Sequence, residues 1–170
     1  IGGYIRNLAA WIRILRGEDA VIPLSDFRDS SWNRFGTSVV GSAHSRVGDA
    51  LFAMQLPVIR MDLLHAPDHV LPERLWTRSV LTVHDLSFWA VPETHSRASR
   101  RYYDRCRDSV SRADAIICVS EFTRGELLRL LSVDSQKVHV VSSGLSPGFS
   151  SVDAQSIQRV RRKYGLSGRY

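Results

Sequence analysis

Four short apolar runs, separated by segments with helical spacing, constrain the fold of this chain more than any other feature. The runs are rich in Val, Ile and Leu and cover residues 62–65, 79–84, 115–120 and 138–142. Near-continuous apolar strands that alternate with helices are typical of a parallel sheet that is covered on both faces. The pattern therefore predicts an α/β domain with a doubly wound, mostly parallel sheet and helices on both faces.

The segments between these runs show the spacing of amphipathic helices. Apolar residues recur every three or four positions in residues 3–16, 46–55, 97–113, 123–131 and 153–164. In the fourth of these, Thr123 and Glu126 have the spacing of a capping box. Residues 20–24 indicate an edge strand, because Pro23 cannot donate to a ladder, and residues 25–45 indicate a long loop.

Composition places the chain among soluble globular proteins. It has 170 residues, of which 44% are hydrophobic and 24% charged, and no stretch of eighteen apolar residues suggests a transmembrane helix. The first residues lack the pattern of a signal peptide, so we expect a cytoplasmic protein, although the chain does not begin with Met. Cys106 and Cys118 have no CxxC neighbours, and we expect buried thiols rather than a disulfide or a zinc site.

The chain is basic, with a formal net charge of +6 that comes mainly from arginine. One cluster lies on the helix predicted over residues 97–113 and includes Arg97, Arg100, Arg101 and Arg105. Such a face can bind an anionic membrane surface or a phosphorylated ligand. An ordinary solvated helix face is the alternative that the sequence leaves open.

Polar residues follow the apolar runs, and they are the candidates for a site. His84 ends the second run and Asp85 follows it, and His65 and Ser120 stand at the ends of two others. Ligands of open parallel sheets bind at the carboxyl ends of the strands. The His84 imidazole could donate to a sugar hydroxyl or a phosphate oxygen, or act as a base near neutral pH. It could instead be a structural histidine bonded to a loop carbonyl. Asp85 could orient His84, or it could cap the following turn, which is the more usual role.

Two further patterns concern metals and anions. In HAPDH, His65 and His69 are four residues apart, but Pro67 disfavours a helix there and no zinc-type ligand set accompanies them. We therefore expect no metal. Gly2 and Gly3 open the first predicted helix, where backbone amides can approach an anion, unless the pair is a plain glycine-rich turn.

Four stretches, taken together, form a familiar pattern: IGGYIRNL, LLHAPDHVLP, VLTVHDLSFWAVPETHS and RADAIICVSEFTRGELLRLLSVDSQKVHVVSSGLSPGF. They resemble the N-terminal, acceptor-side domain of family-4 glycosyltransferases, which are retaining enzymes with the two-domain GT-B fold. The block at residues 112–149 is the most specific part. The resemblance implies that residues 1–150 form a Rossmann-like domain without its first strand. Residues 151–170 would then form a linker helix toward a donor-binding domain absent from this chain.

The resemblance also implies roles for residues. Gly2 and Gly3 match the loop at the donor diphosphate, and His84, with Asp85 beside it, matches the histidine at the donor sugar. A third group of residues falls where such enzymes build part of the acceptor site: His65, Asp68 and His69. The basic helix falls where some relatives touch membranes. The reaction would need a nucleotide-sugar co-substrate but no metal or cofactor, with the leaving diphosphate taking the acceptor proton.

The expected function is therefore transfer of a hexose- or mannose-type sugar to a glycan or lipid-linked acceptor, with this chain inactive alone. The protein would be cytoplasmic and could lie peripherally on the inner face of the membrane. No nucleic acid partner is expected. One departure is the loop at residues 142–146, which reads SSGLS where the family often has PNGVD. Two alternatives stay open: a non-catalytic α/β module that binds an anionic polymer or membrane surface, and an epimerase of similar architecture.

Overall fold

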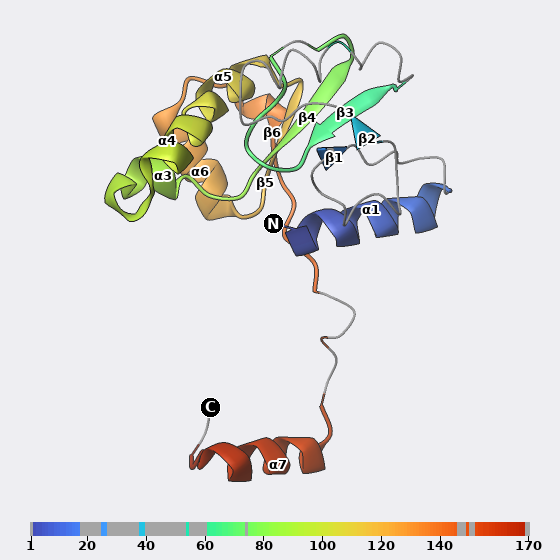
Figure 1. Ribbon diagram of the computed structural model, residues 1–170, viewed down its shortest axis with the longest axis vertical. Coiled ribbons are helices and arrows are strands. Elements are labelled where there is room, and N and C mark those ends of the chain that lie inside the picture. The colour runs from blue at the N-terminus through green and yellow to red at the C-terminus, as the bar shows by residue number, and fades with distance from the viewer. Residues whose placement is uncertain are drawn as a thin grey trace.

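A four-stranded parallel sheet forms the centre of the computed structural model (Figure 1). The structure describes residues 2–17, 25–26, 38–39, 54, 61–73, 75–145, 149 and 152–168. The strands lie in chain order: β3 (Leu63–Ala66), β4 (Arg78–Val83), β5 (Ala115–Cys118) and β6 (Val138–Val140). Each pairs in parallel with its neighbour, as with Val83 opposite Cys118. The predicted parallel α/β sheet is confirmed, and the strands fall within the apolar runs or within one residue of them.

The described part of the chain also contains α-helices. They are α1 (Gly2–Arg16), α3 (Ser87–Ala90), α4 (Arg97–Tyr103), α5 (Arg105–Arg112), α6 (Glu121–Leu130) and α7 (Ala154–Tyr164), with short 3₁₀ turns at Pro92–Thr94 and Ser135–Lys137. The helices α3 to α6 gather on one side of the sheet, and α1 lies away from them on the other (Figure 1). Two-residue strands β1 (Ser25–Asp26) and β2 (Ser38–Val39) pair in parallel within the predicted loop. The edge strand predicted at residues 20–24 lies outside the described residues, as does the helix predicted at 46–55 apart from Met54.

Two helices differ from the sequence prediction. The single helix expected over residues 97–113 is interrupted at Asp104, which keeps helical backbone angles (φ −57°, ψ −26°). The chain therefore continues in nearly the same direction from α4 into α5. Helix α6 begins two residues earlier than predicted, because Ser120 caps it by accepting from the Thr123 amide at 3.1 Å. The predicted capping box is wrong: Glu126 pairs instead with Arg129.

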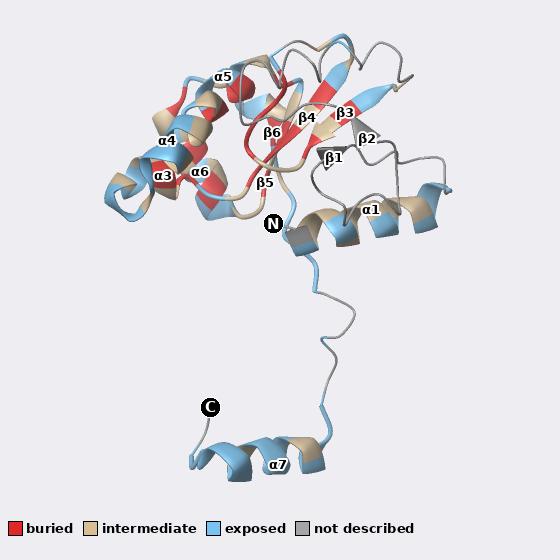
Figure 2. Ribbon diagram, viewed as in Figure 1, coloured by how far each residue is buried: buried red, intermediate tan, exposed pale blue. Residues whose placement is uncertain are grey.

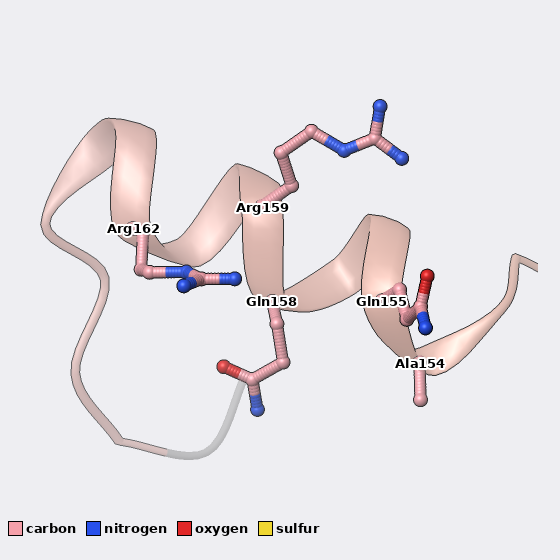
Figure 3. A pocket seen from close by; sticks show the side chains of 5 residues that line it. All are labelled: Ala154, Gln155, Gln158, Arg159 and Arg162. Atoms are coloured by element: carbon pink, nitrogen blue, oxygen red, sulfur yellow. The ribbon is translucent and has the colours of Figure 1, made fainter.

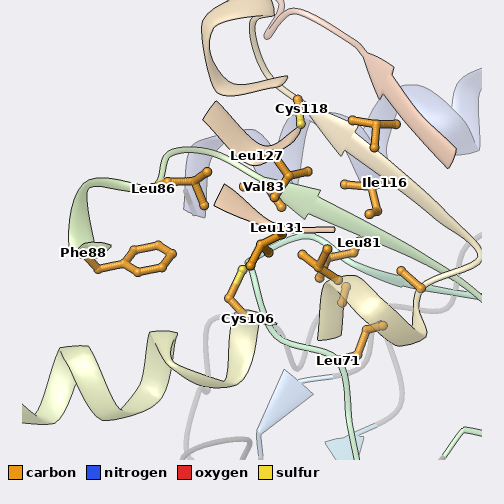
Figure 4. Close-up of a cluster of buried hydrophobic side chains, with 14 residues drawn as sticks. Leu71, Leu81, Val83, Leu86, Phe88, Cys106, Ile116, Cys118, Leu127 and Leu131 are labelled. Atoms are coloured by element: carbon orange, nitrogen blue, oxygen red, sulfur yellow. The ribbon is translucent and has the colours of Figure 1, made fainter. Parts of the chain in front are cut away.

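The hydrophobic core lies between the sheet and the helices α5 and α6 (Figure 4). Leu81 and Val83 of β4 and Ile116 and Cys118 of β5 are all fully buried on this face. They pack with residues of the helices and loops: Leu71, Phe88, Cys106, Val110, Leu127 and Leu131. Both cysteines are buried and unpaired, which confirms the expectation of buried thiols. This core holds the carboxyl ends of the strands in fixed register.

Helix α7 stands apart from the sheet and has no buried residue (Figure 2). Asp153 caps its start by accepting from the Ser156 amide at 2.9 Å, and Gly165 ends it in the left-handed conformation (φ 61°). The helix predicted over residues 153–164 is thus present. Its role as a linker to a second domain stays a prediction.

Candidate functional site

The carboxyl ends of the strands and the start of α1 meet at one edge of the molecule. The ring of Tyr4, in the first turn of α1, lies edge-on to the ring of His84, with the centroids 5.0 Å apart. His84 directly follows β4, and His65 lies in the neighbouring strand β3. The structure therefore brings the helix that begins at Gly2 to the same edge as the predicted histidines.

His84 uses one ring nitrogen for the fold. Its Nε2 donates to the main-chain oxygen of Pro67 at 2.9 Å, so the proton of the neutral ring is on Nε2 and Nδ1 is an acceptor. The Nδ1 atom has no hydrogen-bond partner among the described residues. Among those residues, every side-chain nitrogen or oxygen that is buried does have a partner, so an atom without one is not buried. Nδ1 therefore reaches solvent. The sequence suggested two roles for His84, a structural one and a functional one. The ring can have both, because Nε2 bonds to the backbone and Nδ1 stays available.

Asp85 caps the next turn. Its Oδ1 accepts from the Ser87 amide at 2.8 Å and from the Ser87 hydroxyl at 2.5 Å, and that hydroxyl also bonds to Nε2 of His95 at 2.9 Å. Burial acts to raise the pKa of Asp85, but the two bonds from Ser87 and the nearby His69 and His95 outweigh it, so the pKa is lowered. The carboxylate thus stays charged and is held by Ser87, not by the ring of His84.

His65 is tied into the sheet. Its Nε2 lies 2.8 Å from the hydroxyl of Thr82 on β4. Burial lowers the pKa of His65, because desolvation disfavours the charged ring. The imidazole is therefore neutral at physiological pH, and its described bond is to the neighbouring strand.

His69 and Asp68 form a pair beside His84. The His69 side chain is buried, with Nδ1 2.5 Å from Oδ1 of Asp68 and Nε2 3.2 Å from the main-chain nitrogen of His84. Asp68 is half-buried. Of the three residues predicted on the acceptor side, His69 is thus the one closed off from solvent, whereas the carboxylate of Asp68 and the ring of His65 are only partly covered.

Gly2 and Gly3 form the first turn of α1 rather than a loop before it. Gly3 is exposed, and a Cβ atom placed there would meet nothing within 4 Å. The first turn carries no acidic side chain. The first amides of an α-helix have no partner within the helix itself, so a helix start of this kind favours a bound anion.

The four predicted arginines do not form one exposed face. Arg97 and Arg101 are exposed one turn apart on α4, whereas Arg100 and Arg105 are half-buried. Arg105 lies beyond the interruption at Asp104, at the start of α5. The basic surface that the sequence predicted is thus narrower than expected, because two of its members pack against the protein.

Two surface hollows lie away from this edge. One is on α7, lined by Ala154, Gln155, Gln158, Arg159 and Arg162, whose side chains spread outward from a single helix (Figure 3). The other is at the amino ends of the strands, where Ser79 and Asp114 lie. Neither contains a predicted site residue. In the described part of the chain no three His, Cys, Asp or Glu side chains gather as metal ligands, and metal-free chemistry stays a prediction.

An aromatic cluster that sequence reasoning did not assign to the site surrounds His69. The rings of Phe88 and Tyr103 stack at 4.7 Å, and the Tyr103 ring lies 5.1 Å from that of His69. Ser87, which holds Asp85, and His95, which bonds to the Ser87 hydroxyl, were also missed. The signal was weak: these residues follow the His84–Asp85 pair closely along the chain, but only tertiary contacts show which of them meet.

In a parallel α/β domain such as this one, ligands bind in the crevice outside the carboxyl ends of the strands, where these histidines and the helix start lie. The chain matches Glycosyltransferase Family 4 over residues 49–149, which is more than half of its length, and it belongs to that family. The predicted resemblance is confirmed.

One relative is O-antigen chain mannosyltransferase B of Escherichia coli. It is 30% identical to this chain over 106 residues, which are 62% of the chain but 28% of the relative. The chain thus spans little more than a quarter of that protein's length. Among the described residues, no helix combines the length and hydropathy that crossing a bilayer requires.

Proposed function

We propose that this chain is the acceptor-side part of a retaining glycosyltransferase that takes a hexose, of the mannose type, from a nucleotide sugar. Residues 1–150 would be the acceptor-side domain and residues 151–170 the link to a donor-binding domain. The family supports sugar transfer, and the name of the Escherichia coli relative supports mannose. The acceptor in this proposal is a glycan or lipid-linked glycan at an anionic membrane surface on the cytoplasmic side.

The observation that carries this proposal is the contact between Tyr4 and His84 at 5.0 Å. The contact brings the side chain of a first-turn residue of α1 to the ring at the end of β4, which supports a donor site between the two. Helix starts favour negative charge, because their first amides have no partner within the helix and the helix dipole is positive there. The diphosphate of a nucleotide sugar would lie at Gly2 and Gly3, with its sugar at His84.

The chemistry follows from the groups available. The exposed Nδ1 of His84 is an acceptor in the neutral ring, so it would take a hydrogen bond from a sugar hydroxyl and fix the sugar. Asp85 is bonded to Ser87 and is not offered as a nucleophile. The acceptor hydroxyl would attack from the side of the departing diphosphate, which takes its proton. The amides at the start of α1 would stabilise the charge that develops on the diphosphate.

The test uses the intact protein in which this chain occurs, assayed against a panel of nucleotide sugars with product anomers identified by NMR. We expect transfer of mannose with retained configuration. The variant His84→Ala should lower kcat by about 100-fold, the cost of a misplaced substrate, while circular dichroism stays unchanged.

The matched control is His139→Ala, because His139 is exposed on β6 and has no described role. Its turnover should equal that of the wild type. Equal turnover of His84→Ala and His139→Ala would contradict the role of His84, and product of inverted configuration would contradict the retaining mechanism. Family membership favours this proposal over the binding module and the epimerase that the sequence left open.

A further inference from the structure

The ring of His69 is enclosed and cannot touch a substrate in this structure. The residue is 1% exposed. The ring of Phe88 meets it edge-on at 5.6 Å, and the ring of Tyr103 does so at 5.1 Å. A group that contacts an acceptor sugar needs an open face, so the sequence-based role of His69 on the acceptor side does not account for its placement.

Asp68 decides the tautomer of the His69 ring. A carboxylate only accepts hydrogen bonds, so Nδ1, at 2.5 Å from Oδ1 of Asp68, carries a proton. In the neutral ring Nε2 is then unprotonated and is an acceptor. The pair thus presents a lone pair at a fixed point beside the end of β4.

That lone pair meets the backbone of the proposed catalytic segment. The His84 amide lies 3.2 Å from Nε2 of His69, and the Asp85 amide lies 3.4 Å away. The Asp85 carbonyl, at 3.0 Å, can accept only when the ring is doubly protonated. When the His69 ring is neutral, the partner of Nε2 is therefore the amide of His84.

The backbone of His69 is itself unusual. It has a positive φ of 44°, which among the described residues no other non-glycine residue shows. Side chains rarely adopt this region, and such strain persists where surrounding contacts fix it. The His69 amide donates to the Thr82 carbonyl at 3.0 Å, so the strained turn is anchored to β4 just before His84.

We propose that His69 is a positioning residue: its Nε2 holds the amide of His84 and so fixes the His84 imidazole at the strand edge. This inference rests on the proposed function for its catalytic consequence, but the contact itself can be tested without substrate. Asp68 acts with His69 by setting the tautomer.

Two nearly isosteric variants separate this role from simple packing. In His69→Gln the side-chain oxygen can occupy the place of Nε2 and accept from His84. In His69→Asn the side chain reaches only the place of Nδ1, but asparagine tolerates positive φ better than glutamine. A purely structural role predicts that Asn is the milder change, whereas the positioning role predicts that Gln is.

The first measurement is hydrogen exchange of the His84 amide at pH 8 in the intact protein, with the amides of Leu81 and Val83 as internal references for stability. We expect exchange of the His84 amide about tenfold faster in His69→Asn, and within about twofold of wild type in His69→Gln. Equal exchange in both variants, relative to the references, overturns the proposal.

The second measurement is steady-state kinetics. We expect kcat to fall by about 10- to 100-fold in His69→Asn, the effect of a small misplacement, with the acceptor KM changed less than about twofold. A raised acceptor KM with unchanged kcat overturns the proposal, because it indicates direct acceptor contact. If the wild type transfers no sugar from any donor, the proposed function fails, and the exchange comparison still decides the role of His69.

Discussion

Histidine side chains at the strand edge differ in what their second nitrogen can do. The rings of His65, His69 and His84 each have one nitrogen fixed, by Thr82, Asp68 and Pro67 respectively. His69 is buried and uses its other nitrogen on the backbone, whereas His84 keeps Nδ1 open to solvent. Because ring chemistry needs an accessible nitrogen, His84 is better placed for a sugar contact than His69, although both stand in the same sequence region.

The two thiols give a prediction at the same scale. Burial raises the pKa of Cys106 to about 12 and that of Cys118 to about 11. Because the thiolate is the nucleophile, neither thiol should react with iodoacetamide at pH 8 in the folded protein. Peptide mass spectrometry should find both cysteines less than about one tenth modified after an hour, and fully modified in guanidinium.

Glutathione added to the same tube is the control for reagent activity, and it should be alkylated within minutes. Complete labelling of Cys106 under native conditions would contradict the buried core described for α5, since that residue is fully covered.

At the scale of elements, Asp114 links the starts of β4 and β5. Its Oδ2 accepts from the Ser79 amide at 2.8 Å and from the Ser79 hydroxyl at 3.1 Å. These two bonds lower the pKa of Asp114 from its usual 3.8, and the bond from the Ser79 amide has the larger effect. A carboxylate whose pKa is lowered by folding stabilises the folded state at every pH above the pKa of the unfolded chain. This contribution disappears as the pH falls through the lowered pKa of the folded state.

We therefore expect Asp114→Asn to lower the urea midpoint by a few tenths molar at pH 7, since an exposed carboxylate contributes modestly. The difference from wild type should shrink as the pH falls from about 4 toward the lowered pKa, because the carboxyl of Asp114 is protonated first in the unfolded chain and only then in the folded protein. Asp62→Asn is the control, because Asp62 is exposed and its side chain has no described partner. A difference that is constant from pH 7 to pH 3 would contradict the role of the charge.

The strands were predictable from the sequence, and the helix interruption was not. Strands β4 and β5 lie in short runs rich in Val, Ile and Leu, and such runs indicate buried strands without any knowledge of tertiary contacts. Because parallel strands share one carboxyl edge, the location of His84 followed from the pattern too. The burial of His69 involves the rings of Phe88 and Tyr103, which come from separate helices and which periodicity does not bring together. Nothing in the helical spacing marks the break at Asp104.

For the whole molecule, charge is the property that the fold distributes unevenly. The chain carries a net charge of +6, but of the four arginines predicted as a basic face only Arg97 and Arg101 are exposed, because Arg100 and Arg105 are half-buried. Each arginine near an anionic surface contributes about 1 kcal/mol, so two contribute only weak binding. Peripheral membrane contact, if it occurs through α4, should therefore be salt-sensitive.

The variant Arg97→Glu/Arg101→Glu tests this contact in the intact protein with vesicles that contain about 30% phosphatidylserine. At low salt we expect its partition coefficient to fall by at least about tenfold, because two attractions become repulsions. High salt should abolish the difference by screening. The double variant Arg159→Glu/Arg162→Glu is the control, since it makes the same charge change on exposed positions of α7. Equal losses in the two variants would show that binding depends on net charge rather than on α4. If the wild type does not bind the vesicles, the exposed arginines of α4 are an ordinary solvated surface and the membrane contact is excluded.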